Sequence, residues 1–258
     1  MKNHRKMSNI PLFPDLTSRN TDPELMDDPD SDQARLEKTL GQFSLINRWL
    51  SRVRHVLQQK VISVMQMQPD RTYHLVDLGA GGCDTAAWLL QYSRSKGLKL
   101  KVTACDHDPR VVRYARERYG TCPGLTILQR NLTKLADLSA VDFVFTNHLL
   151  HHLSDTEITE LLQRLSKLNP RLTVMVDIHR RRPVYAGYYL LTLLNRSNSF
   201  VRYDGLLSIR KGFQPDELEH LALEAGLKRD NYQVNKLFPG HLIFTYRSAT
   251  GQGPDTPG

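Results

Sequence analysis

The chain has little of what disulfide-stabilised, metal-binding and membrane-spanning proteins require. Its 258 residues include three cysteines, Cys83, Cys105 and Cys122, which are too few and too scattered for a disulfide framework or a zinc site. The longest apolar run, Val184 to Leu194, is too short to cross a bilayer. Residues 1–20 lack the continuous apolar segment of a signal peptide. We therefore expect a cytoplasmic protein with no membrane span and no metal site.

Basic residues outnumber acidic ones, but no motif interleaves them with aromatic residues as RNA-binding motifs do. The formal net charge is +8, and two short basic clusters lie at Arg52–His55 and His179–Arg182. Scattered basic residues of this kind usually belong to a solvated surface, so we expect no nucleic-acid partner. Several of the arginines could instead receive an anionic or phenolic substrate.

What the chain does contain is a glycine-rich turn between a β-rich apolar segment and a helix-compatible one. Tyr73 to Leu78 predict a strand, and Thr85 to Tyr92 predict a helix. Between them, the run Gly79-Ala80-Gly81-Gly82 lets the backbone turn sharply and brings a ligand close to main-chain N–H groups. The turn therefore predicts a site for a nucleotide-like cofactor.

Two acidic residues beside this turn narrow the choice of cofactor. A dinucleotide site has a third glycine where this chain has Asp84, and a carboxylate there would repel the pyrophosphate. Asp77, on the strand before the turn, could pair with a cationic ligand. S-adenosylmethionine carries an ammonium and a sulfonium group but no phosphate, so it fits these charges better. An NAD-dependent oxidoreductase, whose Tyr-x-x-x-Lys pair is also missing, is the disfavoured alternative.

Three further predicted strands end in polar residues. They run from Leu98 to Asp106, from Val141 to Asn147 and from Leu172 to Asp177. Helices between the strands favour a parallel sheet, whose strand ends share the edge where ligands of open α/β sheets bind. Asp106 could accept hydrogen bonds from both ribose hydroxyls, whereas its rival Asp108 could simply cap the next helix.

These motifs together resemble the class I S-adenosylmethionine-dependent methyltransferases. Asp77, Gly79 and Gly81 match the family's first motif, acidic-x-Gly-x-Gly-x-Gly, and Cys83 stands in place of the third glycine. The run Asn147 to Leu153, with its His-His-Leu, is similar to the fourth-strand segment of small-molecule methyltransferases of the ubiquinone-biosynthesis type. The resemblance implies S-adenosyl-L-methionine as the cofactor.

The resemblance also assigns residues to the cofactor. Its binding residues would be Asp77, Gly79, Gly81, Asp106, Asn131, Leu132 and Asn147. Asn131 would meet the adenine amino group with Leu132 against the ring, although an asparagine in an ordinary turn would look the same.

Catalysis and substrate binding are expected beyond the fourth and fifth strands. His148, His151 and Asp177 are the catalytic candidates, because histidine is the usual general base near neutral pH. His148 and His151 are three residues apart and can share a face, whereas His152 is expected to point elsewhere. Asp204 and Arg210 are the candidate substrate residues; Arg210 could bind a carboxylate or a phenolate.

The predicted fold class is α/β. The family's fold is a Rossmann-like, mostly parallel seven-stranded sheet that a terminal antiparallel hairpin closes, here around residues 231–236 and 241–246. We expect a flexible segment over residues 1–30, a helical cap over 31–70, the methyltransferase domain over 71–247 and a flexible tail over 248–258. The helix ahead of the first strand could form a lid over the cofactor or merely pack on the sheet.

The expected function is methyl transfer to a small-molecule acceptor. The segment that follows the fifth strand is similar to that of bacterial methyltransferases linked to polyketide or quinone-like phenolic metabolites, which favours O-methylation of a phenolic or polyketide-like compound. C-methylation of a quinone-like ring is the alternative within the enzyme class. A non-catalytic cofactor-binding protein is the alternative outside it, and the oligomeric state is not predicted.

Overall fold

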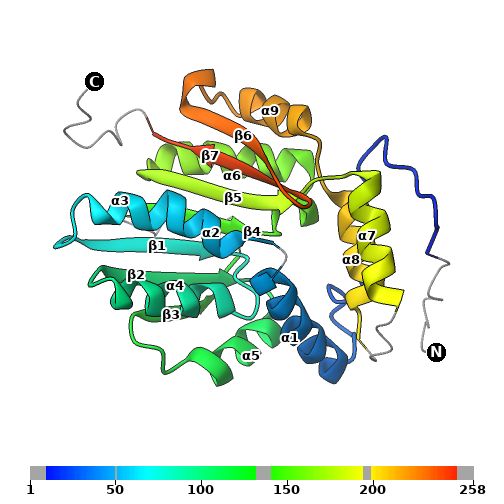
Figure 1. Ribbon diagram of the computed structural model, residues 1–258, viewed down its shortest axis with the longest axis horizontal. Coiled ribbons are helices and arrows are strands. Elements are labelled where there is room, and N and C mark those ends of the chain that lie inside the picture. Colours follow the sequence, from blue (N-terminus) through cyan, green and yellow to red (C-terminus); the bar gives the residue numbers. More distant parts are fainter. Residues whose placement is uncertain (1–9, 50, 132–140, 194–198, 249–258) are drawn as a thin grey trace.

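The computed structural model describes residues 10–49, 51–131, 141–193 and 199–248, with the side chains of residues 47–49 left aside. Within these ranges one sheet of seven strands forms the centre of the molecule (Figure 1). Its strands are β1 (Thr72–Leu78), β2 (Lys99–Asp106), β3 (Leu125–Gln129), β4 (Phe143–Asn147), β5 (Leu172–Ile178), β6 (Tyr232–Leu237) and β7 (His241–Tyr246). Their order in the sheet is β3-β2-β1-β4-β5-β7-β6.

The strand directions follow from the way the chain connects them. β1 to β5 are parallel to their neighbours, as expected for strands joined by helical crossovers. β7 runs antiparallel to both β5 and β6, so the last two strands form the predicted terminal hairpin. All seven residues of β5 are buried, which is typical of a strand covered on both faces. The predicted Rossmann-like architecture is thus confirmed.

Helices and short helical turns cover both faces and one edge of this sheet. The α-helices are α1 (Gln33–Trp49), α2 (Val53–Leu57), α3 (Ser63–Gln66), α4 (Asp84–Ser95), α5 (Pro109–Tyr119), α6 (Asp155–Leu168), α7 (Arg182–Leu193), α8 (Val201–Lys211) and α9 (Pro215–Glu224). The short turns are η1 (Gln58–Ile62), η2 (Leu150–His152) and η3 (Arg229–Asn231). A capping box, Ser154 with Glu157, begins α6.

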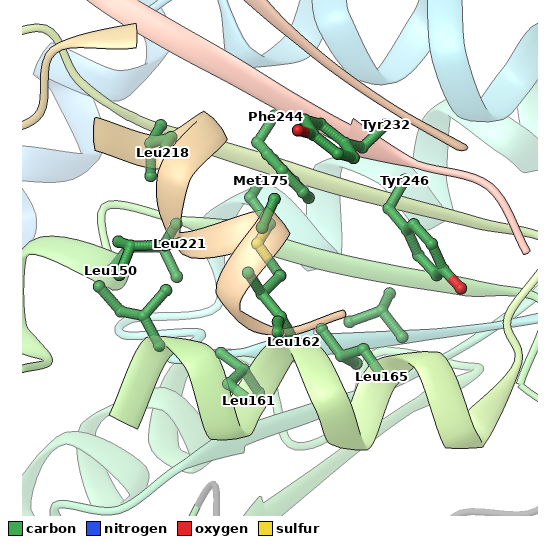
Figure 2. Close-up of a cluster of buried hydrophobic side chains, with 14 of the residues drawn as sticks. Leu150, Leu161, Leu162, Leu165, Met175, Leu218, Leu221, Tyr232, Phe244 and Tyr246 are labelled. Atoms are coloured by element: carbon green, nitrogen blue, oxygen red, sulfur yellow. The ribbon is translucent and has the colours of Figure 1, made fainter. Parts of the chain in front are cut away.

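Two large apolar clusters hold the layers together. One joins α2, η1, α3 and α4 to one face of the sheet, and the other joins α6 and α9 to the opposite face. Figure 2 shows the second cluster, in which Leu162 and Leu165 of α6 lie below Met175 of β5. Because Leu162 is 3% exposed, truncating it to alanine should cost about 2–5 kcal/mol. These clusters fix the strand ends that build the site.

A cap of three helices stands beyond the C-terminal ends of the parallel strands. α7 and α8 lie together there, with α1 below them and the N-terminal segment beside them (Figure 1). We call residues 10–32 the N-terminal strap. Asp204 of α8 accepts hydrogen bonds from the N–H groups of Leu25 (2.8 Å) and Met26 (3.0 Å) of this strap. Arg110 and Arg180 also donate to strap carbonyls.

The cap therefore differs in composition from the sequence-based expectation. Of the predicted cap over residues 31–70, α1 alone takes part, while α2, η1 and α3 pack into the sheet cluster. Residues 10–30, which composition predicts to be flexible, contribute Glu24, Met26 and Asp27 to the cavity beneath the cap. Within the described ranges, no helix is both long and apolar enough to span a bilayer.

Candidate cofactor and acceptor site

A cavity of about 930 Å³ opens between the strand ends and the cap. Its floor comes from the ends of β1, β2 and β4 and from the glycine-rich turn, and its roof from the strap, α1, α7 and α8. The volume lies within the range of small-molecule and cofactor sites. This is the edge at which ligands of open α/β sheets are expected.

The glycine-rich turn brings the backbone close to the cavity. Gly79 and Gly81 adopt φ values of +67° and +52°, a region that glycine enters without strain. The N–H groups of Gly79 and Ala80 donate to the carbonyl of Cys105, which holds β1 and β2 together at their ends. A Cβ on Gly79 would lie 2.7 Å from Leu149 Cδ1, so this position requires glycine.

Cys83, which stands where the family motif has its third glycine, preserves the turn. It adopts φ +60° like a glycine, and its N–H donates to the Ala80 carbonyl at 3.0 Å. A left-handed conformation costs a non-glycine residue about 1–2 kcal/mol. The thiol is 1% exposed, and burial raises its pKa far above the usual range. Cys83 is therefore a small buried side chain and not a reactive thiol.

Three carboxylates gather beside the turn. Asp77, Asp84 and Asp106 all line the cavity. Burial raises the pKa of each, and the pKa of Asp77 is raised well above its usual value because Asp84 and Asp106 also repel its charge. A cationic ligand would relieve this repulsion. The donor set therefore fits the ammonium and sulfonium groups of S-adenosylmethionine and opposes a pyrophosphate.

The two aspartates at the end of β2 have separate roles. Asp106 accepts hydrogen bonds from the N–H groups of Gly81 (3.0 Å) and Asp108 (3.1 Å), which fixes its carboxylate at the cavity wall. Asp108 caps α5 by accepting the Arg110 N–H at 2.8 Å. The capping role considered for Asp108 is thus observed, whereas Asp106 lines the cavity at the end of β2.

The remaining predicted cofactor residues lie at the ends of β3 and β4. Asn131 is exposed and lines the cavity. Asn147 also lines it, and its buried Oδ1 has no hydrogen-bond partner among the described residues, so it can accept one from a ligand. Leu132 lies outside the described residues.

His151 and Asp177 form a buried pair at the far side of the cavity. His151 Nδ1 lies 2.7 Å from Asp177 Oδ1, and the carboxylate also accepts the N–H groups of Leu150 (2.8 Å) and Ile178 (2.7 Å). Burial alone would raise the pKa of Asp177, but His151, His148 and the Ile178 N–H lower it well below its usual range. An ionised Asp177 makes Nδ1 of His151 the donor, and Nε2 of the ring points away from Asp177.

The strap supplies a carboxylate that faces this pair. Glu24 is 2% exposed, and its Oε1 lies 3.7 Å from His151 Nε2, 3.4 Å from Lys211 Nζ and 2.9 Å from the Ser208 hydroxyl that donates to it. Ligand atoms of Glu24, His151 and His152 lie within 4.8 Å of one another, close enough to hold a metal ion. The ammonium of Lys211 already compensates the charge of Glu24 and would repel a cation there.

His152 takes part in the same cluster, contrary to the expectation that it points elsewhere. Its Nδ1 lies 3.0 Å from Asp27 Oδ2, and it lines the cavity. Although burial opposes the charged form, Glu24 and Asp27 raise the pKa of His152 to about 9. The expectation failed because residues 150–152 form a 3-10 turn and not the α-helical turn on which it rested.

The two predicted substrate residues lie outside the described lining of the cavity. Asp204 is fully buried and binds the strap backbone, as described above, while the Arg210 carbonyl accepts the Asn20 N–H at 3.0 Å. The helical period explains this placement, since α8 turns Gly205, Ser208 and Ile209 toward the cavity. A direct substrate contact by Asp204 or Arg210 is therefore not seen, and both residues hold the strap instead.

The sequence did not single out Glu24, His241 and Tyr188, which also line the cavity. The acids at positions 24 and 27 stand among Pro23, Leu25 and Met26, and these apolar neighbours were a signal against a solvated tail. His241 gave no local signal, because the hairpin alone brings it to the site.

Comparison with known proteins agrees with this geometry. Residues 75–169 match the model of the methyltransferase domain family. No curated protein matches the sequence significantly. Among solved structures, human N-acetylserotonin methyltransferase in complex with S-adenosylmethionine is 17% identical with a TM-score of 0.58, and the match covers 84% of this chain and 56% of that one.

Two further structures are similar over most of the chain. The plantazolicin methyltransferase BpumL, in complex with S-adenosylhomocysteine, is 14% identical with a TM-score of 0.61, and the match covers 87% of this chain and 94% of that one. The carbon methyltransferase CurJ is 12% identical with a TM-score of 0.60, and the match covers 84% of this chain and 61% of that one. At these sequence identities, the similarity shows that the proteins share a fold.

Residues 75–169 therefore form a methyltransferase domain, and the sheet has the Rossmann-like fold of the methyltransferase structures compared above. The cofactor that such a domain implies is S-adenosylmethionine, in agreement with the carboxylates that line the cavity. The family match ends before β5, so the strap, α7 and α8, which also line the cavity, lie outside it.

Proposed function

We propose that the protein transfers a methyl group to a hydroxyl oxygen of a small phenolic or enolic acceptor, with His151 as the general base. The observation that carries this proposal is the His151–Asp177 pair in the same cavity as Asp77, Gly79 and Asp106. A phenol must lose its proton before or during attack on the methyl group. A histidine that a buried carboxylate orients is suited to accept that proton.

Residues in different parts of the cavity have different roles in this proposal. Asp77, Asp106 and Asn147 hold the cofactor, with the turn of Gly79 and Gly81 beneath it. S-adenosylmethionine supplies an electrophilic methyl group when it is bound. The strap, α1, α7 and α8 enclose the acceptor and exclude water from the reacting groups. Methyl transfer is an in-line displacement, so this orientation is a large part of catalysis.

The proton has a defined route. Asp177 keeps the proton of His151 on Nδ1, so Nε2 receives the proton of the acceptor hydroxyl. The resulting imidazolium lies between the carboxylates of Asp177 and Glu24, which stabilise its charge. The bound cofactor would supply the methyl group to the acceptor oxygen and keep the electron pair of the broken carbon–sulfur bond, while His151 holds the proton.

C-methylation of a quinone-like ring is the second candidate within this class. An activated ring carbon needs less help from a base, so the built His151–Asp177 pair favours O-methylation. The three free cysteines, Cys83, Cys105 and Cys122, suit the reducing cytoplasm that we propose as the compartment.

The test uses methyl-labelled S-adenosylmethionine with a panel of phenols, enols and hydroquinones. We expect a methoxy signal in the product NMR spectrum and at least a 100-fold lower rate for His151→Ala, with unchanged affinity for S-adenosylmethionine. A C-methyl signal would instead establish the second candidate. An unchanged rate in His151→Ala would remove the base from the mechanism.

A further inference from the structure

Two histidines from distant parts of the chain stack on each other at the cavity. His148 directly follows β4 and His241 begins β7, and their rings are parallel within 1° with centroids 5.1 Å apart. The N–H of His148 donates to the Val176 carbonyl at 2.9 Å, and His241 pairs with Ile178 in the β5–β7 ladder. Strands of the sheet therefore hold both rings.

Each ring presents a nitrogen that lacks a partner. His148 Nε2 and His241 Nδ1 are buried, and neither has a hydrogen-bond partner in the described part of the chain. Buried polar atoms in folded proteins are almost always hydrogen-bonded, so an orphan pair in a cavity points to a ligand or to bound water. Both residues line the cavity of about 930 Å³. The two nitrogens are thus available to an acceptor.

The electrostatic surroundings of the two rings restrict what they can bind. Burial lowers the pKa of His148 to about 3, and His241 acts in the same direction. Burial also lowers the pKa of His241 to about 4, against the opposing effect of Asp177. Both rings are therefore uncharged at neutral pH. A carboxylate or phosphate would find no imidazolium here and would be repelled by Asp177.

The walls next to this pair are apolar and leave space. Pro183, Val184 and Leu191 of α7 line the cavity together with Phe238 and Pro239 of the hairpin loop. Gly187, on the same helix, also lines it, and a Cβ there would meet no atom within 4 Å. This space suits a flat apolar molecule.

We propose that His148 and His241 form a subsite for an uncharged aromatic or enolic acceptor that carries a hydroxyl next to a carbonyl. One neutral imidazole can donate a hydrogen bond to the carbonyl while the other donates one to the hydroxyl oxygen, which leaves the hydroxyl proton for His151. The ring centroids of His148 and His151 are 6.1 Å apart, so the bound hydroxyl also lies near the base. This subsite rests on the proposed function and specifies its substrate class.

The test compares two ligands that share one ring. 2-Hydroxyacetophenone carries an uncharged carbonyl beside its hydroxyl, and salicylate carries a carboxylate in the same place. Each is titrated by ligand-observed NMR into the full chain saturated with S-adenosylhomocysteine. We expect the ketone to bind at least tenfold more tightly than salicylate. His241→Phe keeps a ring on His148 but removes the nitrogens, so it should weaken ketone binding at least tenfold with unchanged affinity for S-adenosylhomocysteine.

Controls separate the possible outcomes. His220→Phe, at an exposed position of α9, should bind the ketone like the wild type. Should His241→Phe fail to fold, Gly187→Leu narrows the cavity that both histidines line and must weaken ketone binding. Equal or tighter binding of salicylate, no binding of the ketone, or full binding by the variants would overturn the subsite. Failure of S-adenosylhomocysteine itself to bind would instead overturn the proposed function.

Discussion

Replacing Asp177 by asparagine separates the chemistry of the site from its architecture. The carboxylate is 1% exposed and accepts four contacts, from His151 Nδ1 and from the N–H groups of Leu150, His151 and Ile178. Each oxygen serves at least one backbone N–H, so either orientation of an asparagine amide turns its NH₂ group toward an N–H. One or two buried donors then lack acceptors, at a cost of about 1–3 kcal/mol each.

The expected loss of stability is therefore about 2–4 kcal/mol. For a domain of this size, that lowers the melting temperature by roughly 5–15 °C. The asparagine also no longer fixes the proton of His151 on Nδ1, so the turnover number should fall by about 100-fold or more. Affinity for S-adenosylmethionine should stay within about threefold, because Asp177 lies outside the carboxylate cluster around Asp77.

Asp142→Asn is the matched control. Asp142 is also buried, accepts the His74 N–H at 3.0 Å and pairs with Arg71, but it directly precedes β4, at the end of the strand away from the cavity. The Asp142→Asn variant should be less stable than the wild type, but its folded molecules should keep the wild-type turnover number. Calorimetric melting curves give the stability of both variants, and initial rates give their turnover numbers. Equal turnover numbers for Asp177→Asn and Asp142→Asn would refute the role of the His151–Asp177 pair.

Three further perturbations test the turn, the cluster and the strap. Gly79→Ala should lower the free energy of unfolding by about 1–3 kcal/mol and weaken S-adenosylmethionine binding at least tenfold, because the new Cβ meets Leu149. Gly81→Ala is the control, since Gly81 also has a positive φ but a Cβ there would meet open space. It should lose less stability and less affinity when both are measured by calorimetry. The pKa of His152 is raised to about 9, so the stability that its charge contributes is complete below about pH 6.5 and is lost as the pH rises through 9. In His152→Gln the melting temperature should therefore change less with pH over this range. A variant whose melting temperature follows the same pH profile as the wild type would contradict the charge cluster. Arg180→Met should lower the free energy of unfolding by about 3–5 kcal/mol and expose residues 10–32 to limited proteolysis, since the buried guanidinium binds Glu217 and the strap. A variant of full stability with an uncleaved strap would show that Arg180 does not hold the strap in place.

Local patterns in the sequence predicted the sheet and the cofactor half of the site. The strand ends at Asp106 and Asn147 were readable because each apolar run stops at a polar residue, and the crossover helices fix the strands as parallel. The glycine turn carries its conformational requirement in the residue type itself. Such signals depend on neighbouring residues alone, and they therefore survive without knowledge of the tertiary structure.

The acceptor half depended on contacts that no local pattern encodes. Glu24 reaches His151 across more than a hundred residues of chain, and His241 stacks on His148 because the hairpin returns to β5. Asp204 was chosen for its charge, but the face of α8 that meets the cavity is set by packing against α7. Composition alone did not distinguish a packed strap from a mobile tail.

The cofactor claim is tested most directly by calorimetric titration of the full chain with S-adenosylmethionine and, separately, with NAD. The account predicts micromolar binding of S-adenosylmethionine to the wild type, at least a tenfold loss in Asp106→Ala, and no binding of NAD. Asp108→Ala is the control, because Asp108 caps α5, and it should keep most of the affinity. Binding of NAD in place of S-adenosylmethionine, or full affinity in Asp106→Ala, would contradict the account.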